Sequence, residues 1–157
     1  MELKLRYVAP FFYILKKDGS LQLVQNYQKL NQVTIKDKIP LPLIREVINK
    51  LKKAKYFNKL DLIWGYNNVQ IKEDNKWKAA FLTNKELFKP QVMYFRLCNL
   101  LGTFQRMINS IFWELLHEGV LVNYMDNFMI PTRIIKELEE RTIQFLKIMK
   151  KHNLCFK

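Results

Sequence analysis

The sequence has little glycine, cysteine or histidine, and each shortage excludes a class of protein. Only four of its 157 residues are glycine and 49% are hydrophobic, so the chain is neither low-complexity nor disordered. Two cysteines, Cys98 and Cys155, are too few for a disulfide framework. Two histidines, His117 and His152, lack the spacing of zinc ligands. We therefore expect an intracellular domain with free thiols.

Long apolar runs are also missing. No stretch reaches the length of a transmembrane helix, and charged residues (Glu2, Lys4 and Arg6) come first. The apolar segment 8–15 is short and is interrupted by Pro10, so it is not typical of a secretory signal. We expect no membrane partner and a cytoplasmic or nuclear location.

Acidic residues are scarce relative to basic ones. The chain has 14 Asp and Glu against 27 Lys and Arg, which gives a net charge of +13 and a pI near 9.8. This excess predicts an anionic partner, and nucleic acid is the commonest one. The alternative is a solvated basic surface or a scaffold role. The length allows one domain, or one domain with a subdomain, and a substantial core.

Turn signals and hydrophobic periodicity predict an α+β fold. The first half should contain a hairpin over 11–25 with its turn at Asp18-Gly19, and then a helix with one apolar face formed by Leu43, Ile44, Val47, Ile48 and Leu51. We then expect a strand ending at Asp61, two strands within 67–83 and a strand at Gln91–Leu97. The last part should contain a helix capped by Thr103 and ended by Gly119, a hairpin at Met125-Asp126, and a final helix whose inward residues are Ile134, Ile135, Leu138, Phe145, Leu146 and Met149. This order predicts an antiparallel sheet with helices on one face.

Two isolated aspartates end or interrupt apolar runs. Asp61 follows the apolar residues after Tyr56, and Asp126 lies inside Val120–Ile130. Two carboxylates on buried strand ends, far apart in sequence, suggest a shared site for divalent cations, because magnesium prefers hard oxygen ligands. For each aspartate alone, the alternative is a residue that caps a backbone N–H at a turn.

A series of short motifs occurs in a fixed order along the chain. They are APFF at 9–12, KKDGS at 16–20, NYQKLN at 26–31, TIKDKIPLP at 34–42, AKYFNKLD at 54–61, WGYNNVQI at 64–71, WKAAF at 77–81 and TFQ at 103–105. Together they resemble the reverse transcriptase of gypsy-like LTR retrotransposons over nearly all of residues 8–157. The resemblance implies the fingers and palm of a right-hand polymerase. It also implies that residues 1–157 are a polyprotein fragment without thumb, connection or RNase H.

The resemblance assigns roles to individual residues. Asp61 and Asp126, with the Leu62 carbonyl, would hold two Mg²⁺ ions, and Asn127 stands where the family has a third carboxylate. Nucleotide-binding positions would be Lys16, Lys17, Gln22, Tyr66 and Arg96. Tyr66 would lie under the incoming sugar and exclude a 2′-hydroxyl. The implied function is RNA-directed DNA polymerisation, in which dNTPs are added to a primer on an RNA or DNA template.

Several important positions depart from the family pattern. Gln22 replaces an arginine that clamps the triphosphate, Arg96 replaces a glycine, and Asn127 removes a negative charge. Each of these changes can arise from one G-to-A or C-to-T transition, which predicts a copy decayed by mutation. Because the changes affect the positions that would hold metal ions and the triphosphate, we expect polymerase activity to be impaired or lost. The alternatives are a nucleic-acid-binding module without chemistry, and a relic open reading frame with no selected function.

Overall fold

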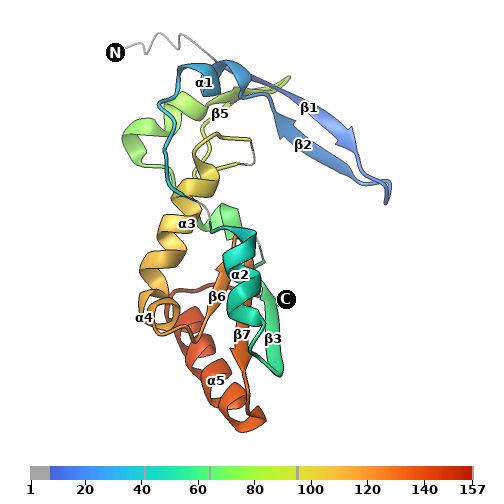
Figure 1. Cartoon of the computed structure of the whole chain (residues 1–157). Coiled ribbons are helices and arrows are strands. Elements are labelled where there is room, and N and C mark those ends of the chain that lie inside the picture. The colour runs from blue at the N-terminus through green and yellow to red at the C-terminus, as the bar shows by residue number, and fades with distance from the viewer. Residues whose placement is uncertain (1–7, 41, 64, 95, 157) are drawn as a thin grey trace. The chain divides into compact units, whose positions relative to one another are not determined.

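The computed structural model describes residues 8–40, 42–63, 65–94 and 96–156, which form two compact units (Figure 1). Unit 1 comprises Met1–Lys36 and Val69–Leu100, and unit 2 comprises Asp37–Asn68 and Leu101–Lys157. The charged residues at positions 2, 4 and 6, on which the expectation about a signal peptide depends, lie outside the described residues.

Unit 1 is built on a four-stranded sheet of order β2-β1-β4-β5. Strand β1 (Ala9–Leu15) pairs antiparallel with β2 (Leu21–Gln25) and parallel with β4 (Phe81–Leu82), and β4 pairs antiparallel with β5 (Leu87–Phe88). The predicted first hairpin is confirmed.

The turn of this hairpin depends on Asp18 and Gly19. Gly19 has a φ of +80°, which a residue without Cβ adopts at no steric cost. The Asp18 carboxylate accepts a hydrogen bond from the Ser20 backbone N–H at 2.9 Å. The Ser20 hydroxyl also donates to it, at 2.7 Å, and these bonds lower the pKa of Asp18.

A small core closes unit 1 around Tyr27, which directly precedes α1 (Gln28–Val33). The Tyr27 hydroxyl donates to the Ala79 carbonyl oxygen at 2.9 Å. Burial, and then the neighbouring Tyr94, raise the pKa of Tyr27 far above its usual value, so the phenol stays protonated as a donor.

Of the two strands predicted within 67–83, only the end of the second is a strand, β4 (Phe81–Leu82). A 3-10 helix, η1 (Gly65–Asn68), overlaps the start of this stretch, and a second, η2 (Glu73–Ala79), occupies its middle. In η2, acidic residues lie in the first turn and lysines in the last, an order that complements the helix dipole. The strand predicted at Gln91–Leu97 is also wrong: its described part has one isolated bridge, from Val92 to Gln70.

Unit 2 carries a three-stranded antiparallel sheet of order β3-β7-β6. Its strands are β3 (Tyr56–Asp61), β6 (Val122–Tyr124) and β7 (Asn127–Thr132). Helix α5 (Ile135–Lys151) packs against β7 and β3, and α2 (Ile44–Leu51) packs against β6 (Figure 1). The predicted α+β class is confirmed.

Three buried phenylalanines hold helices against this sheet. Phe112 lies in the helical segment 100–117, Phe128 on β7 and Phe145 on α5. The ring centroids of each pair are 5.1 to 5.3 Å apart. Aromatic pairs at such spacing contribute about 0.5–1.5 kcal/mol beyond the burial of their area. This cluster therefore fixes β7, and with it the preceding hairpin turn, against the helical layer.

The predicted long helix is two helices, α3 (Leu100–Ile111) and α4 (Trp113–His117). The Thr103 cap is wrong, because α3 already begins at Leu100. Gly119, with a φ of +71°, ends the helical segment as predicted.

The inward faces predicted for two other helices are confirmed only in part. In α2 only Val47 is buried, while Ile44 and Ile48 are exposed. In α5, Phe145 and Met149 are buried but Ile135 is exposed.

Candidate active site

The register of β3 against β7 brings the two predicted aspartates together. Asp61 pairs with Asn127 across the two strands, and the Leu62 backbone N–H donates to the Asp126 carbonyl oxygen at 2.9 Å. Segments far apart in the sequence therefore become neighbours at one end of the sheet.

Asp126 is held in a tight turn. Tyr124 pairs with Asn127, so Met125 and Asp126 form a two-residue connection between β6 and β7. Met125 has a φ of +57°, a conformation that costs a non-glycine residue energy. A positive φ at the first central position is the pattern of a type II′ turn.

The carboxylates have partners in this turn and strand end. Lys59 Nζ lies 3.3 Å from Asp61 Oδ1, an ion pair whose members are more than half exposed and which contributes little stability. The Asn127 Nδ2 donates to Asp126 Oδ1 at 3.0 Å. Asn127, which the resemblance places at a third carboxylate position, therefore presents a donor to its neighbour.

Tyr66 belongs to the same neighbourhood. It lies in η1, and its ring packs on Phe104 with centroids 4.8 Å apart. Burial raises the pKa of Tyr66, and the negative charge of Asp126 raises it further. A Cβ on the adjacent Gly65 would lie 2.9 Å from Leu62 Cδ2, so a larger residue here would require the end of the Leu62 side chain to shift.

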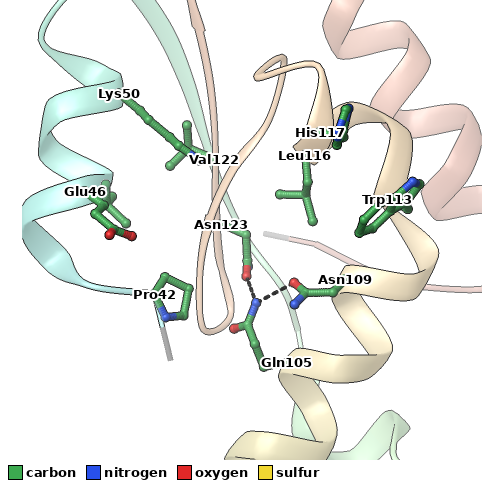
Figure 2. Close-up of a pocket in the computed structure, with 11 residues that line it drawn as sticks. Pro42, Glu46, Lys50, Gln105, Asn109, Trp113, Leu116, His117, Val122 and Asn123 are labelled. Carbon is green, nitrogen blue, oxygen red and sulfur yellow. Dashed lines mark hydrogen bonds between the residues drawn. The ribbon is translucent and has the colours of Figure 1, made fainter. Parts of the chain in front are cut away.

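A chain of hydrogen-bonded polar side chains connects helix α3 to the hairpin (Figure 2). Gln105 Nε2, from α3, donates to Asn123 Oδ1 at 2.7 Å and to Asn109 Oδ1 at 2.9 Å. Asn123 Nδ2 in turn donates to the Met125 carbonyl oxygen at 2.7 Å. Sequence reasoning missed Gln105 and Asn123, although a lone asparagine within the apolar run before Tyr124 was a usable signal.

A cavity of about 260 Å³ lies beside this chain, between α2, the α3–α4 segment and β6 (Figure 2). It is lined by both apolar and charged side chains, among them Val47, Trp113 and Lys50.

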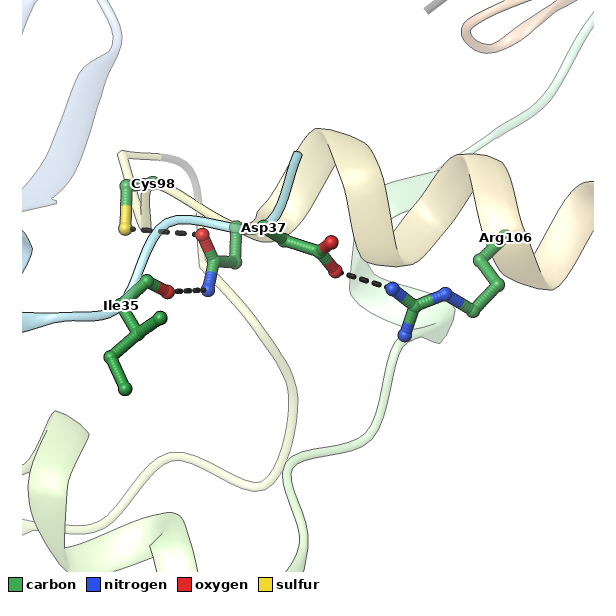
Figure 3. Close-up of polar contacts among 5 residues, drawn as sticks. Ile35, Asp37, Cys98 and Arg106 are labelled. Atoms are coloured by element: carbon green, nitrogen blue, oxygen red, sulfur yellow. Dashed lines mark hydrogen bonds and ion pairs between the residues drawn. The ribbon is translucent and has the colours of Figure 1, made fainter. Parts of the chain in front are cut away.

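The segment that leads into α2 is tied to α3 by an ion pair. Arg106 and Asp37 approach to 2.5 Å (Figure 3). Within unit 1, the Asn99 amide donates to the Ile35 carbonyl oxygen at 2.8 Å. These two contacts hold the segments around residues 35 and 37, and neither adds a group to the candidate active site.

The possible metal ligands are few compared with the two ions that the resemblance implies. Among the described residues, no three His, Cys, Asp or Glu side chains are grouped so that they could hold a metal ion. Two carboxylates and a carbonyl, as Asp61, Asp126 and Leu62 would supply, are a ligand set of the kind that one divalent cation takes. A second ion would have too few charged ligands.

The other positions predicted to bind the nucleotide belong to unit 1. Lys16, Lys17 and Gln22 are exposed on the β1–β2 hairpin. Arg96 is also exposed, and its guanidinium carbon lies 5.8 Å from the ring centroid of Phe12.

Arg96 occupies a backbone conformation suited to glycine, with a φ of +82°. We expect the Arg96→Gly variant to be more stable than Arg96→Ala by about 1 kcal/mol, because both lose the contact with Phe12 but only glycine relieves the left-handed strain. Urea denaturation of the two variants measures the difference. Equal midpoints would show that the positive φ carries no cost.

A family model described as Reverse transcriptase (RNA-dependent DNA polymerase) matches residues 14–157. The chain belongs to the reverse transcriptase family. This reverse transcriptase domain is 34% identical over 137 residues to an RNA-directed DNA polymerase homolog from Oenothera berteroana, covering 87% of the chain and 95% of that relative.

Longer relatives come from transposons. A retrovirus-related Pol polyprotein from transposon 297 of Drosophila melanogaster is 33% identical over 147 residues, covering 90% of the chain and 14% of the polyprotein. The Tf2-7 polyprotein of Schizosaccharomyces pombe is 31% identical over 146 residues, covering 93% of the chain and 11% of the polyprotein. The reverse transcriptase domain thus spans a small part of these polyproteins.

Solved structures share the fold. A foamy viral protease-reverse transcriptase in complex with double-stranded DNA superposes with a TM-score of 0.85 at 18% identity, covering 96% of the domain and 26% of that chain. A mutant protease-reverse transcriptase of prototype foamy virus gives 0.78 at 16% identity, covering 95% and 20%. The family model and the relatives confirm the predicted reverse transcriptase family, while the gypsy-like subtype stays a prediction. In the described part of the domain, no helix is both long and apolar enough to cross a membrane.

Proposed function

We propose that this domain derives from the RNA-directed DNA polymerase of a gypsy-like LTR retrotransposon and has an impaired catalytic site. The observation that carries the proposal is the pairing of Asp61 with Asn127, beside the contact between Leu62 and Asp126. In the proposal, the two carboxylates and one neutral amide at these strand ends correspond to the positions at which family members would hold metal ions.

The inherited reaction joins the primer 3′-hydroxyl to the α-phosphate of a dNTP and releases pyrophosphate. Bound divalent ions would activate the hydroxyl and neutralise charge on the phosphates. Asp61, Asp126 and the Leu62 carbonyl would be their ligands. Tyr66, which packs on Phe104 near Asp126, would exclude a ribose 2′-hydroxyl by its bulk.

Three substitutions weaken this machinery in the proposal. Asn127 brings no charge and donates to Asp126, so the site loses a ligand. Gln22 lacks the charge and the two-pronged donor geometry of an arginine on the triphosphate. Arg96 puts a large side chain where the family has none, and contacts Phe12 instead.

A second candidate function is nucleic-acid binding without chemistry. It is favoured by the net charge of +13, which does not depend on the metal site. Binding of this kind would weaken with salt, show little sequence preference and need no magnesium. A relic reading frame without a selected function is the third reading, and absence of transcript and protein would favour it.

Primer extension by the purified chain tests the proposed impairment. With a template–primer, dNTPs and Mg²⁺, we expect extension indistinguishable from that of an Asp61→Asn control, since losing several kcal/mol of transition-state stabilisation lowers a rate by about three orders of magnitude or more. Fluorescence anisotropy with the same template–primer, with and without Mg²⁺, measures binding in parallel. Robust extension that Asp61→Asn abolishes would overturn the impairment and support an active polymerase.

A further inference from the structure

A second cleft of unit 2 lies at the opposite end of the β3–β7 pair from the candidate active site. The cavity measures about 360 Å³ and is lined by Thr132 and by residues of the first turns of α5. Thr132 pairs with Tyr56, whereas Asp61 pairs with Asn127. The two ends are five residues apart along β3, or about 16 Å at about 3.3 Å per residue.

The lining of this cleft is strongly basic. Lys50, Lys53, Arg133 and Arg141 all contribute to it, and Glu137 is its one carboxylate. Glu137 is already paired with Arg141, with an N–O distance of 2.5 Å. Four cations and one carboxylate leave three net positive charges, which is a potential that attracts an anion.

Backbone carbonyl groups hold both guanidinium groups in place. Arg133 Nε donates to the Lys53 carbonyl oxygen at 3.3 Å, and Arg141 donates to the Pro131 carbonyl oxygen at 3.2 Å. The remaining N–H groups of each fork are additional donors, and forks held in this way favour ligands with several acceptor oxygens.

The N-terminus of α5 opens on the same cleft. Ile134 is its N-cap residue, no side chain caps the helix, and Ile134 and Glu137 both line the cavity. The first N–H groups of a 17-residue helix carry a partial positive charge and bind anions well.

Thr132 gives an independent indication that this cleft takes a ligand. The residue lines the cavity and is only 4% exposed. Its hydroxyl oxygen has no hydrogen-bond partner within the part of the chain that the structure describes. A buried hydroxyl without a partner is unfavourable, and an acceptor oxygen bound in the cleft would relieve it.

We propose that this cleft binds a phosphate group. A phosphate is a compact, multiply charged anion with several acceptor oxygens, and the cleft offers lysine ammonium groups, two guanidinium forks, uncapped helix N–H groups and one orphan hydroxyl. Free phosphate and a backbone phosphate of nucleic acid share this chemistry. The site involves neither Asp61 nor Asp126, so it stands or falls separately from the proposed polymerase ancestry.

Titration of the full chain with inorganic phosphate in low-salt chloride buffer, followed by amide NMR, tests the proposal. We expect saturable shifts at Arg133 and at the first residues of α5. Lys53→Gln should weaken this binding about tenfold, as expected for losing one charged hydrogen bond. The matched control is Lys52→Gln, which removes the same charge from an exposed neighbour outside the cleft and should change the affinity less than about twofold.

Thr132→Val tests the hydroxyl separately. The substitution keeps the side-chain shape and removes the unpartnered oxygen, so we expect it to raise the melting temperature and to weaken phosphate binding about fivefold. Weaker binding in a more stable protein cannot be attributed to unfolding.

A short oligothymidylate distinguishes the two sources of phosphate. If it shifts the same amides and competes with inorganic phosphate, the cleft takes a backbone phosphate; if phosphate alone shifts them, the ligand is a free anion. Either result supports the site. Shifts that do not saturate, or equal losses for Lys52→Gln and Lys53→Gln, would show only diffuse attraction to a basic surface and overturn it.

Discussion

Replacing Asn127 with aspartate should strengthen divalent-cation binding by about 100-fold, or roughly 2.7 kcal/mol at about 1.4 kcal/mol per factor of ten. The variant adds a carboxylate directly across from Asp61 and beside Asp126. It also removes the amide that donates to Asp126 Oδ1. Unit charges about 4 Å apart near a protein surface interact by about 4 kcal/mol, of which exposure to water and salt removes a part.

Calorimetric titration with Mn²⁺ measures this change, and two variants control it. Asn109→Asp adds the same charge to α3 and keeps the acceptor for Gln105, but lies outside the hairpin, so its cation affinity should stay near that of the parent chain. Asn127→Leu removes the amide without adding charge and should not strengthen binding. If Asn109→Asp and Asn127→Asp gain equally, the effect is long-range charge and the two aspartates do not form a metal site.

The same variant should still extend primers poorly. Tighter cation binding restores one missing ligand, but Gln22 and Arg96 are unchanged and are proposed to act on the triphosphate. Full recovery by Asn127→Asp alone would show that these two positions do not limit the reaction.

The sequence predicted the strand and hairpin contacts that bring Asp61 and Asp126 together better than it predicted the elements around them. The roles of the two aspartates stay predictions. Asp61 and Asp126 stood out because a charge in an apolar run requires a cause, and the Met125-Asp126 hairpin followed from the apolar segments on either side. The Asp18-Gly19 turn was equally predictable, because these two residue types favour the backbone conformation of the turn. These features are local, or depend on one strand pairing.

The failures share a different cause. Residues 73–79 were expected to lie partly in strands because Trp77 and Phe81 suggested alternation, but only Phe81, in β4, lies in a strand. The α2 face was expected to be buried because periodicity shows which residues share a face but not what covers it. The basic cleft draws on α2, β7 and α5, so no sequence window contains it.

The polar chain behind the hairpin gives the largest expected effect on stability. We expect Asn123→Leu to lower the free energy of unfolding by about 2–3 kcal/mol, because it removes the donor to the Met125 carbonyl oxygen and one acceptor of Gln105 Nε2 in a buried setting. Gln105→Leu should lower the free energy of unfolding by less, about 1–2 kcal/mol. The substitution also removes the buried Oε1, which has no partner among the described residues and is therefore unfavourable in the folded protein.

The double variant separates a coupled chain from two independent contacts. Replacing both Gln105 and Asn123 with leucine leaves only the Met125 carbonyl short of a partner, so its cost should be about that of Asn123→Leu alone rather than the sum. Urea denaturation of the four proteins measures the coupling. Asn109→Ala, which removes the exposed acceptor of the same Gln105 amide, should cost less than about 0.5 kcal/mol. Additive costs would mean that α3 and the hairpin are stabilised separately. Non-additive costs mean that the turn carrying Asp126 depends on a residue of α3, and so that mutations distant from the carboxylates can displace them.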